Sequence, residues 1–242
     1  VLSSVRNDNV FMKKKVYLLL LVVASLALPS CKSSPKSEES VSNINNVLQD
    51  SVEAILEKHL VVYGAMDGVA IVMETESGKI RTMVGLEAKG DSTYERVDSL
   101  AASKHSSALM RTVSVLAALN TGKVKPDDMF DSGVGIFVYD NDTIYDHNWR
   151  KGGYGELTLR QALAYSSDVA ITRAVDEAFP DKKDFLASVR KMSFGQPLEV
   201  EGMKLDSCVQ DSEMPWCYYA MGFQEITPLQ MLAFYNAIAN KD

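Results

Sequence analysis

The chain has 242 residues, a formal net charge of −7, and contains 46% hydrophobic and 24% charged residues. This length is sufficient for one core of ordinary size. No basic patch interleaved with aromatic residues appears, which argues against a nucleic-acid partner. No group of Cys and His residues has the spacing of a zinc site, so we expect no metal and no cofactor. The histidines His59, His105 and His147 are isolated in the sequence, and we interpret each as a surface or structural residue.

The N-terminal region has the pattern of a secreted, lipid-anchored protein. We interpret residues 1–11, which precede the first methionine, as an upstream extension or a fragment boundary. Residues 12–30 combine lysines, an apolar run too short to span a bilayer and a small-residue exit, which is typical of a signal peptide. Cys31 closes this run and resembles the cysteine of a bacterial lipoprotein box, so we expect it to be the lipid anchor. Ordinary secretion with an unmodified Cys31 is the alternative. The polar residues 31–42 should form a flexible tether.

Two further cysteines, Cys208 and Cys217, lie in the remainder of the chain. They could form a disulfide in an oxidising compartment such as the periplasm. Two reduced, buried thiols are an equal alternative, because sequence spacing does not supply the geometry that a disulfide needs. From the N-terminal pattern we expect a cell-envelope lipoprotein that is held on a membrane by its lipid and faces the periplasm or the exterior.

Residues 43–242 are predicted to form a domain of mixed helices and strands. Apolar residues recur at helical spacing between Val47 and Leu60, which predicts an amphipathic helix. Two β-rich runs, Gly68–Glu74 and Lys79–Gly85, are joined by a short glycine-containing turn and predict a hairpin. The first run is continuously apolar, so we expect it inside a sheet that is covered on both faces. Residues 87–105 are polar and predict irregular structure.

The second half of the chain predicts helices separated by loops. The apolar helix Leu109–Leu119 is followed by Gly122, a residue favoured just past a helix end. A loop-rich region with a short strand at Ile136–Tyr139 comes next. Thr158 is a plausible N-cap for the following helix. The remaining helices are predicted over residues 157–165, 168–179, 183–192 and, from Pro228 at the favoured first position, 228–240.

Two segments have the frame of an acyl-transfer site. The first runs from His105 to Leu119, and the second reads Tyr165-Ser166-Ser167-Asp168. These frames resemble the Ser-x-x-Lys and Ser-x-Asn boxes of penicillin-binding transpeptidases. In the first box a serine attacks the substrate and a lysine one turn later accepts its proton. The family's serine, lysine, second serine and asparagine correspond here to Ala108, Arg111, Ser166 and Asp168.

The resemblance extends from about Asp50 to Asn240 and includes the predicted hairpin, the loop that begins Asp146-His147-Asn148-Trp149, and the segment Gly222–Asn240. This last segment is similar to the late helix of class B, division-type proteins. The resemblance implies an α+β fold of the penicillin-binding and serine β-lactamase type, an antiparallel sheet flanked by helices. No Lys-Thr-Gly box follows, so we expect a partial domain that is truncated at its C-terminus and lacks the C-terminal strands.

The departures from the two boxes imply that the chemistry is lost. Ala108 has no hydroxyl, so no acyl-enzyme can form at that position. A guanidinium stays protonated at any usable pH, so Arg111 cannot act as a general base. Asp168 replaces an amide by a carboxylate, which would repel an anionic substrate end. In the family the serine matched by Ser166 relays protons, and the simpler interpretation of Ser166 is the N-cap of the next helix.

The resemblance therefore implies an inactive, membrane-anchored domain of peptidoglycan biogenesis. Its expected partners are stem peptides, a β-lactam bound weakly or not at all, and a cell-wall synthase or division protein. Two alternatives stay open: an active serine D,D-transpeptidase or related penicillin-binding hydrolase that uses another serine, such as Ser107, and a non-binding structural lipoprotein or gene fragment. Ser188 and Lys191 also spell Ser-x-x-Lys, and we interpret that match as a coincidence because it follows the second box inside a helix.

Overall fold

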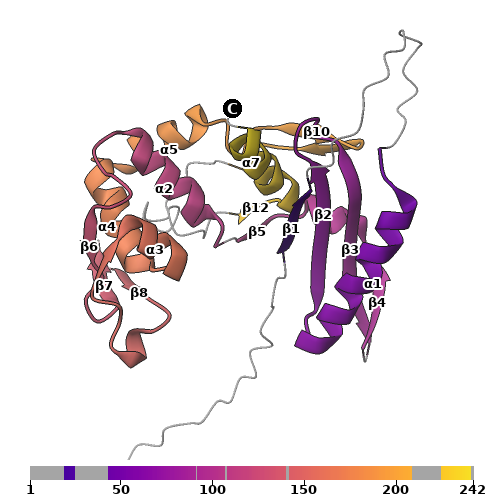
Figure 1. Cartoon of the computed structure of the whole chain (residues 1–242), viewed down its shortest axis with the longest axis horizontal. Helices are drawn as coiled ribbons and strands as arrows, with labels where there is room; N and C mark the ends of the chain where they lie inside the picture. The colour runs from indigo at the N-terminus through magenta and orange to yellow at the C-terminus, as the bar shows by residue number, and fades with distance from the viewer. Residues whose placement is uncertain are drawn as a thin grey trace, which may run out of the picture. The chain divides into compact units, whose positions relative to one another are not determined.

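The computed structural model describes residues 19–24, 43–90, 92–106, 108–139, 142–208 and 225–240. The chain separates into two compact units, residues 1–101 and residues 102–242, and Figure 1 shows the elements of each. Cys31, the tether and the predicted upstream extension lie outside the described residues, as do Ser107 and Cys217. The lipid anchor and the disulfide therefore stay predictions, as does the signal peptide, of which only residues 19–24 are described.

The first unit is a sheet in the order β1-β2-β3-β4 with one helix packed against it. The predicted hairpin is confirmed, because β2 and β3 pair antiparallel with Ile71 opposite Met83. The sheet is larger than the hairpin alone: β1, from within the predicted signal peptide, pairs parallel with β2, and β4 lies where irregular structure was predicted. The elements are β1 Leu19–Ala24, α1 Asn46–Tyr63, β2 Asp67–Glu74, β3 Ile80–Gly90, β4 Thr93–Arg96 and the 3-10 helix η1 Asp98–Ala102.

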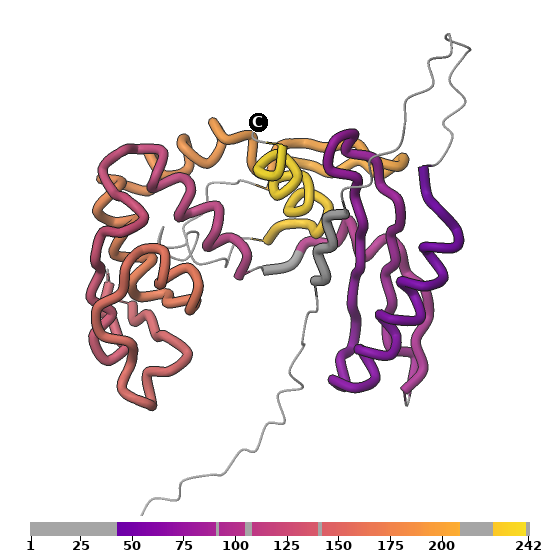
Figure 2. The backbone as a smooth tube through the Cα atoms, in the orientation of Figure 1, coloured from indigo at the N-terminus to yellow at the C-terminus, as the bar shows by residue number. Residues whose placement is uncertain are grey.

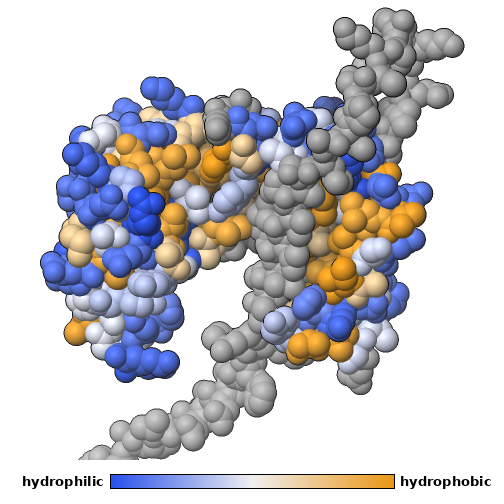
Figure 3. Space-filling view, viewed as in Figure 1, coloured by the Kyte–Doolittle hydropathy of each residue, from blue (hydrophilic) through white to orange (hydrophobic). Residues whose placement is uncertain are grey.

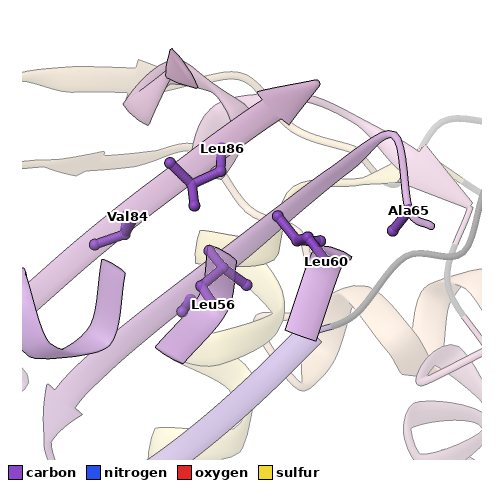
Figure 4. Close-up of a cluster of buried hydrophobic side chains, with 6 residues drawn as sticks. Leu56, Leu60, Ala65, Val84 and Leu86 are labelled. Carbon is purple, nitrogen blue, oxygen red and sulfur yellow. The ribbon is translucent and has the colours of Figure 1, made fainter. Parts of the chain in front are cut away.

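Helix α1 packs on this sheet through the apolar stripe that its sequence predicts. Leu56 and Leu60 are buried against Val84 and Leu86 of β3, as Figure 4 shows, and Figure 2 shows α1 running along that strand. A Cβ atom added to Gly68 would lie 2.7 Å from Leu60 Cδ2, so the glycine lets the helix approach β2 closely. Burial of each leucine contributes roughly 1.5–3 kcal/mol.

A buried polar contact fixes the register between α1 and β3. The Gln49 Oε1 atom accepts hydrogen bonds from Thr82 Oγ1 at 2.7 Å and from the Met83 backbone N–H at 3.0 Å. Gln49 lies inside the otherwise apolar stripe, and these bonds satisfy its carbonyl oxygen. Several large side chains of α1 stay exposed: Val47, Ile55, Val61, Val62 and Tyr63. Figure 3 shows hydrophobic residues on the visible face of this unit.

The second unit consists of helices linked by short two-stranded ladders: β5 with β12, β6 with β9, β7 with β8, and β10 with β11. The helices predicted from sequence are confirmed to within a few residues. None of the helices in the described part of the chain is both long and apolar enough to cross a bilayer. The bounds are β5 His105–Ser106, α2 Met110–Asn120, β6 Met129–Asp131, β7 Ile136–Tyr139, β8 Asp142–Tyr145, η2 Trp149–Lys151, β9 Glu156–Thr158, α3 Leu159–Tyr165, α4 Asp168–Ala178, α5 Lys182–Lys191, β10 Leu198–Val200, β11 Met203–Leu205, β12 Glu225–Ile226 and α7 Pro228–Asn240.

Helices α2 and α4 lie in contact and form the centre of this unit. Both helices carry small and β-branched residues that are fully buried, among them Val113, Ala117, Ile171 and Ala174. Small side chains let the two backbones approach closely, so the first turns of both helices are held by a packed core. The described residues thus form the α+β arrangement that the sequence predicts, and both sequence boxes begin a helix of this unit.

Candidate functional site

The two boxes meet through an ion pair between Arg111 on α2 and Asp168 on α4. The Arg111 Nε atom lies 2.5 Å from Asp168 Oδ1, and Nη2 lies 3.0 Å from Oδ2. This is the two-point geometry in which a planar guanidinium recognises a carboxylate. The side chains are only 17% and 20% exposed, so both charges are largely withdrawn from water. Arg111 and Asp168, which the sequence predicts at the family's lysine and asparagine positions, therefore complement each other in charge.

The helix ends set the electrostatics of this pair. Asp168 is the first residue of α4, where the helix macrodipole favours a negative charge. Arg111 is the second residue of α2, where the macrodipole disfavours a positive charge, and the carboxylate offsets this cost. Burial raises the pKa of Asp168 above its ordinary value, and the hydrogen bonds and charge of Arg111 oppose that rise.

Ala108 lies in an exposed turn just before α2 begins. Its carbonyl oxygen accepts from the Arg111 backbone N–H at 3.2 Å, so the chain from Ala108 to Arg111 forms a single tight turn. The segment before it, β5, is held by antiparallel pairing with β12, which directly precedes α7. Ala108, which the sequence predicts at the family's nucleophile position, thus presents a methyl group at this exposed turn.

Ser166 is not the N-cap of α4, and that interpretation of the sequence was wrong. Ser166 ends α3 in the left-handed conformation, with φ 55° and ψ 45°, and its side chain is exposed. The N-cap is Ser167, whose buried hydroxyl oxygen accepts from the Ala170 backbone N–H at 3.1 Å. Left-handed backbone costs about 1–3 kcal/mol for a residue with a side chain and persists only where the surrounding structure imposes it.

A buried carboxylate, Asp146, imposes the shape of this loop. Asp146 is fully buried and follows strand β8. Its Oδ2 atom accepts from the Ser167 hydroxyl at 2.8 Å, and its Oδ1 atom accepts from the Val169 backbone N–H at 3.0 Å. These bonds fix the first turn of α4 and, with it, the position of Asp168. In the sequence, Asp146 is evident only as the first residue of a resembling loop, because nothing local to it marks its partners.

The remaining predicted residues fall outside this arrangement. Cys208 is buried, and burial raises the pKa of its thiol to about 11. Ser188 and Lys191 lie on α5 and line a pocket with Phe179, and Arg111 and Asp168 do not line it. Among the described residues, no three His, Cys, Asp or Glu side chains gather in a way that could hold a metal ion.

Arg111 supplies a paired cation to this arrangement. A guanidinium does not release its proton at a usable pH, so the cation at this site cannot deprotonate a nucleophile. Its Nε and Nη2 groups are engaged by Asp168. The site therefore offers a fixed ion pair, an exposed serine at Ser166, and the backbone of a tight turn at Ala108.

Comparison with known proteins identifies the family to which most of the chain belongs. A family model described as "Penicillin binding protein transpeptidase domain" matches residues 68–242. The penicillin-binding protein 1A of Aquifex aeolicus is 28% identical over 178 residues, which cover 72% of this chain and 22% of that protein. A probable peptidoglycan D,D-transpeptidase, PbpC, of Pseudomonas aeruginosa is 25% identical over 175 residues, covering 69% of this chain and 30% of that protein. The chain thus spans less than a third of either relative.

Solved structures give the same fold. The transpeptidase domain of penicillin-binding protein 3 from Burkholderia pseudomallei, in its apo form, superimposes with a TM-score of 0.64. It is 19% identical, and the match covers 85% of this chain and 60% of that one. At this level of identity the likeness concerns the fold alone, and the chemistry has to be argued from the residues described above.

Proposed function

Because this chain belongs to the family of penicillin-binding protein transpeptidase domains, we propose that it is a non-acylating member that serves peptidoglycan biogenesis by binding. The Arg111–Asp168 pair is the observation that carries this proposal. An active site of this family needs a nucleophile and a base that can take its proton. Ala108 provides no nucleophile, and Arg111 provides a cation that stays protonated and is already engaged.

The proposed ligand is the stem peptide of peptidoglycan, and the proposed role is that of an accessory protein beside a cell-wall synthase or division protein. Support comes from the retained frame: the turn at Ala108, the loop at Ser166 and the ordered first turns of α2 and α4. A lipid on Cys31 would hold the domain at the membrane of the cell envelope, next to nascent peptidoglycan. Mass spectrometry of the membrane fraction tests that anchor through the mass of the N-terminal peptide.

Fluorescent-penicillin labelling tests the loss of acylation. We expect the purified, folded chain to remain unlabelled, with circular dichroism as the control for folding. The matched variant carries Ala108→Ser together with Arg111→Lys, which restores both groups of the first box. Labelling of this double variant and not of the parent chain would locate the defect at these two positions.

Two results would overturn the proposal. A stable adduct on the parent chain, mapped by mass spectrometry to Ser107 or another serine, would make the protein an active acyl-transfer enzyme. A folded chain that binds neither stem peptides nor a cell-wall protein in a pull-down would leave a structural lipoprotein with an inherited fold.

A further inference from the structure

An aromatic cluster borders the second box and plays no part in the chemistry discussed so far. Tyr165 directly precedes Ser166 and is 48% exposed, although it is a large side chain at the end of a helix. Its ring stacks on Tyr154, with ring centroids 5.5 Å apart and planes inclined by 18°. Tyr165 therefore stays about half exposed while its ring stacks on a second ring.

The supporting ring is itself fixed. The Tyr154 hydroxyl lies 3.3 Å from the Tyr165 carbonyl oxygen and 3.0 Å from His147 Nε2. A hydroxyl carries a single proton, so donation to the carbonyl leaves its oxygen to accept from His147. The imidazole also packs edge-on against the Tyr154 ring, with centroids 5.7 Å apart. His147 follows Asp146, the buried carboxylate that positions α4. The segment that fixes the second box therefore also carries a residue of the aromatic cluster.

The cluster and the ion pair lie in one neighbourhood of the same unit. Tyr165 is three residues from Asp168. His147 lies close enough to Asp168 to act electrostatically on its carboxyl group. Tyr165 and Ser166 are consecutive and both exposed, so a ligand that contacts Ser166 lies next to Tyr165.

We propose that the exposed face of Tyr165 binds a sugar ring of peptidoglycan, next to the place where the attached stem peptide is held. This inference rests on the proposed function and assigns contact with the glycan part of the ligand to Tyr165. A pyranose presents C–H groups on its face and hydroxyl and acetamido groups on its edge. A tyrosine ring with a polar tip matches that combination, because its face is apolar and its surroundings are wet. The cluster holds the ring in place before binding, which limits the entropy lost when the sugar docks.

A second exposed tyrosine provides a matched control. Tyr145 on β8 is 49% exposed, nearly the same as Tyr165, and its ring contacts Trp149 with centroids 5.4 Å apart. It differs in position, because it lies on the outward face of the β7–β8 ladder opposite Ile136 and is not part of the cluster beside Ser166. Substituting it removes a comparable exposed ring from the same unit.

The test compares three probes by isothermal calorimetry on the full chain. The probes are a pentapeptide ending in D-Ala-D-Ala, the same peptide on an N-acetylglucosamine–N-acetylmuramic acid disaccharide, and the disaccharide alone. We expect the glycopeptide to bind the parent chain about tenfold more tightly than the peptide, a difference of the size found for one aromatic stacking contact. Tyr165→Ala should abolish this difference and leave the affinity for the peptide unchanged. Tyr165→Phe and Tyr145→Ala should preserve the difference.

The probes separate failure of this inference from failure of the proposed function. Peptide binding with equal affinities of the parent chain and Tyr165→Ala for the glycopeptide would overturn the sugar site and leave the proposed function standing. Disaccharide binding that depends on Tyr165, with no peptide binding, would support the sugar site and count against stem-peptide recognition. An equal loss of glycopeptide affinity in Tyr145→Ala would also overturn the assignment to Tyr165. Thermal unfolding of each variant checks that the loss is not a folding defect.

Discussion

Arg111 and Asp168, 57 residues apart in the chain, are joined by a two-point ion pair between the first turns of α2 and α4. Each side chain is less than a quarter exposed, so neither charge is well hydrated without the other. Removing one partner of such a pair leaves an uncompensated charge, which costs more than removing both. We therefore expect Arg111 and Asp168 to be coupled in their contributions to stability.

A double-mutant cycle measures this coupling. We expect Arg111→Met and Asp168→Leu each to lower the free energy of unfolding by about 2–4 kcal/mol, because each leaves a partly buried charge without its partner. The double variant should lose less than the sum of the two, with a coupling energy of about 1–3 kcal/mol. Urea unfolding followed by circular dichroism gives the values. Additive losses within about 0.5 kcal/mol would show that the pair is not coupled.

The pH dependence of stability should change when Arg111 is replaced. Burial raises the pKa of Asp168 above 3.8, and Arg111 opposes the rise. A folded-state pKa above the unfolded one means that the folded protein binds more protons in the window just above pH 3.8. Stability therefore falls as pH rises through that window. In Arg111→Met the opposing interactions are gone, so the window should extend to higher pH and the fall should be larger.

Urea midpoints measured from pH 3.5 to 7 for the parent chain and for Arg111→Met test this expectation. The Arg111→Met, Asp168→Leu double variant is the matched control, because it has no carboxyl group at this position and should lack the added slope. Superimposable pH profiles for the parent chain and the single variant would contradict the assignment of the effect to Asp168.

Asp146 should contribute far more to stability than an exposed aspartate of the same unit. Asp146→Ala leaves the Ser167 hydroxyl and the Val169 backbone N–H without their acceptor in a buried site. We expect a loss of about 2–4 kcal/mol in the free energy of unfolding. Asp127→Ala is the control, because that side chain is 82% exposed and its substitution should change stability by less than about 0.5 kcal/mol. Equal effects of the two variants would show that Asp146 does not organise the loop.

Gly85 marks a close approach of two backbone segments in the first unit. A Cβ atom at this position would lie 2.2 Å from the Val97 carbonyl oxygen, a backbone atom that cannot rotate away. The Gly85 carbonyl also accepts from the Val97 N–H at 2.7 Å, so the two segments are tied at that distance. Gly85→Ala should cost about 1–3 kcal/mol or more in thermal unfolding. Gly90→Ala, whose Cβ would meet only Thr93 Oγ1 at 3.6 Å, should cost much less.

Features that depend on local sequence were predicted well. Thr158 caps α3, as expected, and the side chain of Gln161 completes a capping box with it. The β2–β3 hairpin and the last helix from Pro228 also follow from short-range patterns of apolar, glycine and proline residues. The positions of Ala108, Arg111 and Asp168 relative to helix starts were likewise evident, because both boxes lie next to strong helical periodicity.

Features that depend on residues distant in the sequence were not predicted. Strand β4 was missed because its sequence is polar, and it forms by pairing with β3. The choice of Ser167 over Ser166 as N-cap depends on a hydrogen bond to Asp146, 21 residues earlier. His147 looked isolated in the sequence, and its contacts with Tyr154 arise only when the chain turns back through η2. Each of these is decided by tertiary packing, which local propensity does not encode.

The hydroxyl groups of Tyr235 on α7 and Thr112 on α2 lie 2.8 Å apart although 123 residues separate them in the sequence. Bringing together two residues so far apart in the sequence is slow, because the conformational entropy of the intervening chain is lost before the contact forms. Thr112 lies in the first turn of α2, one residue after Arg111. During synthesis it can form this hydrogen bond only after the chain has been extended through Tyr235. Both boxes are therefore synthesised before α7, whereas this hydrogen bond forms only after α7 has been added. A nascent chain on a ribosome stalled ahead of α7 would lack the hydrogen bond between Tyr235 and Thr112.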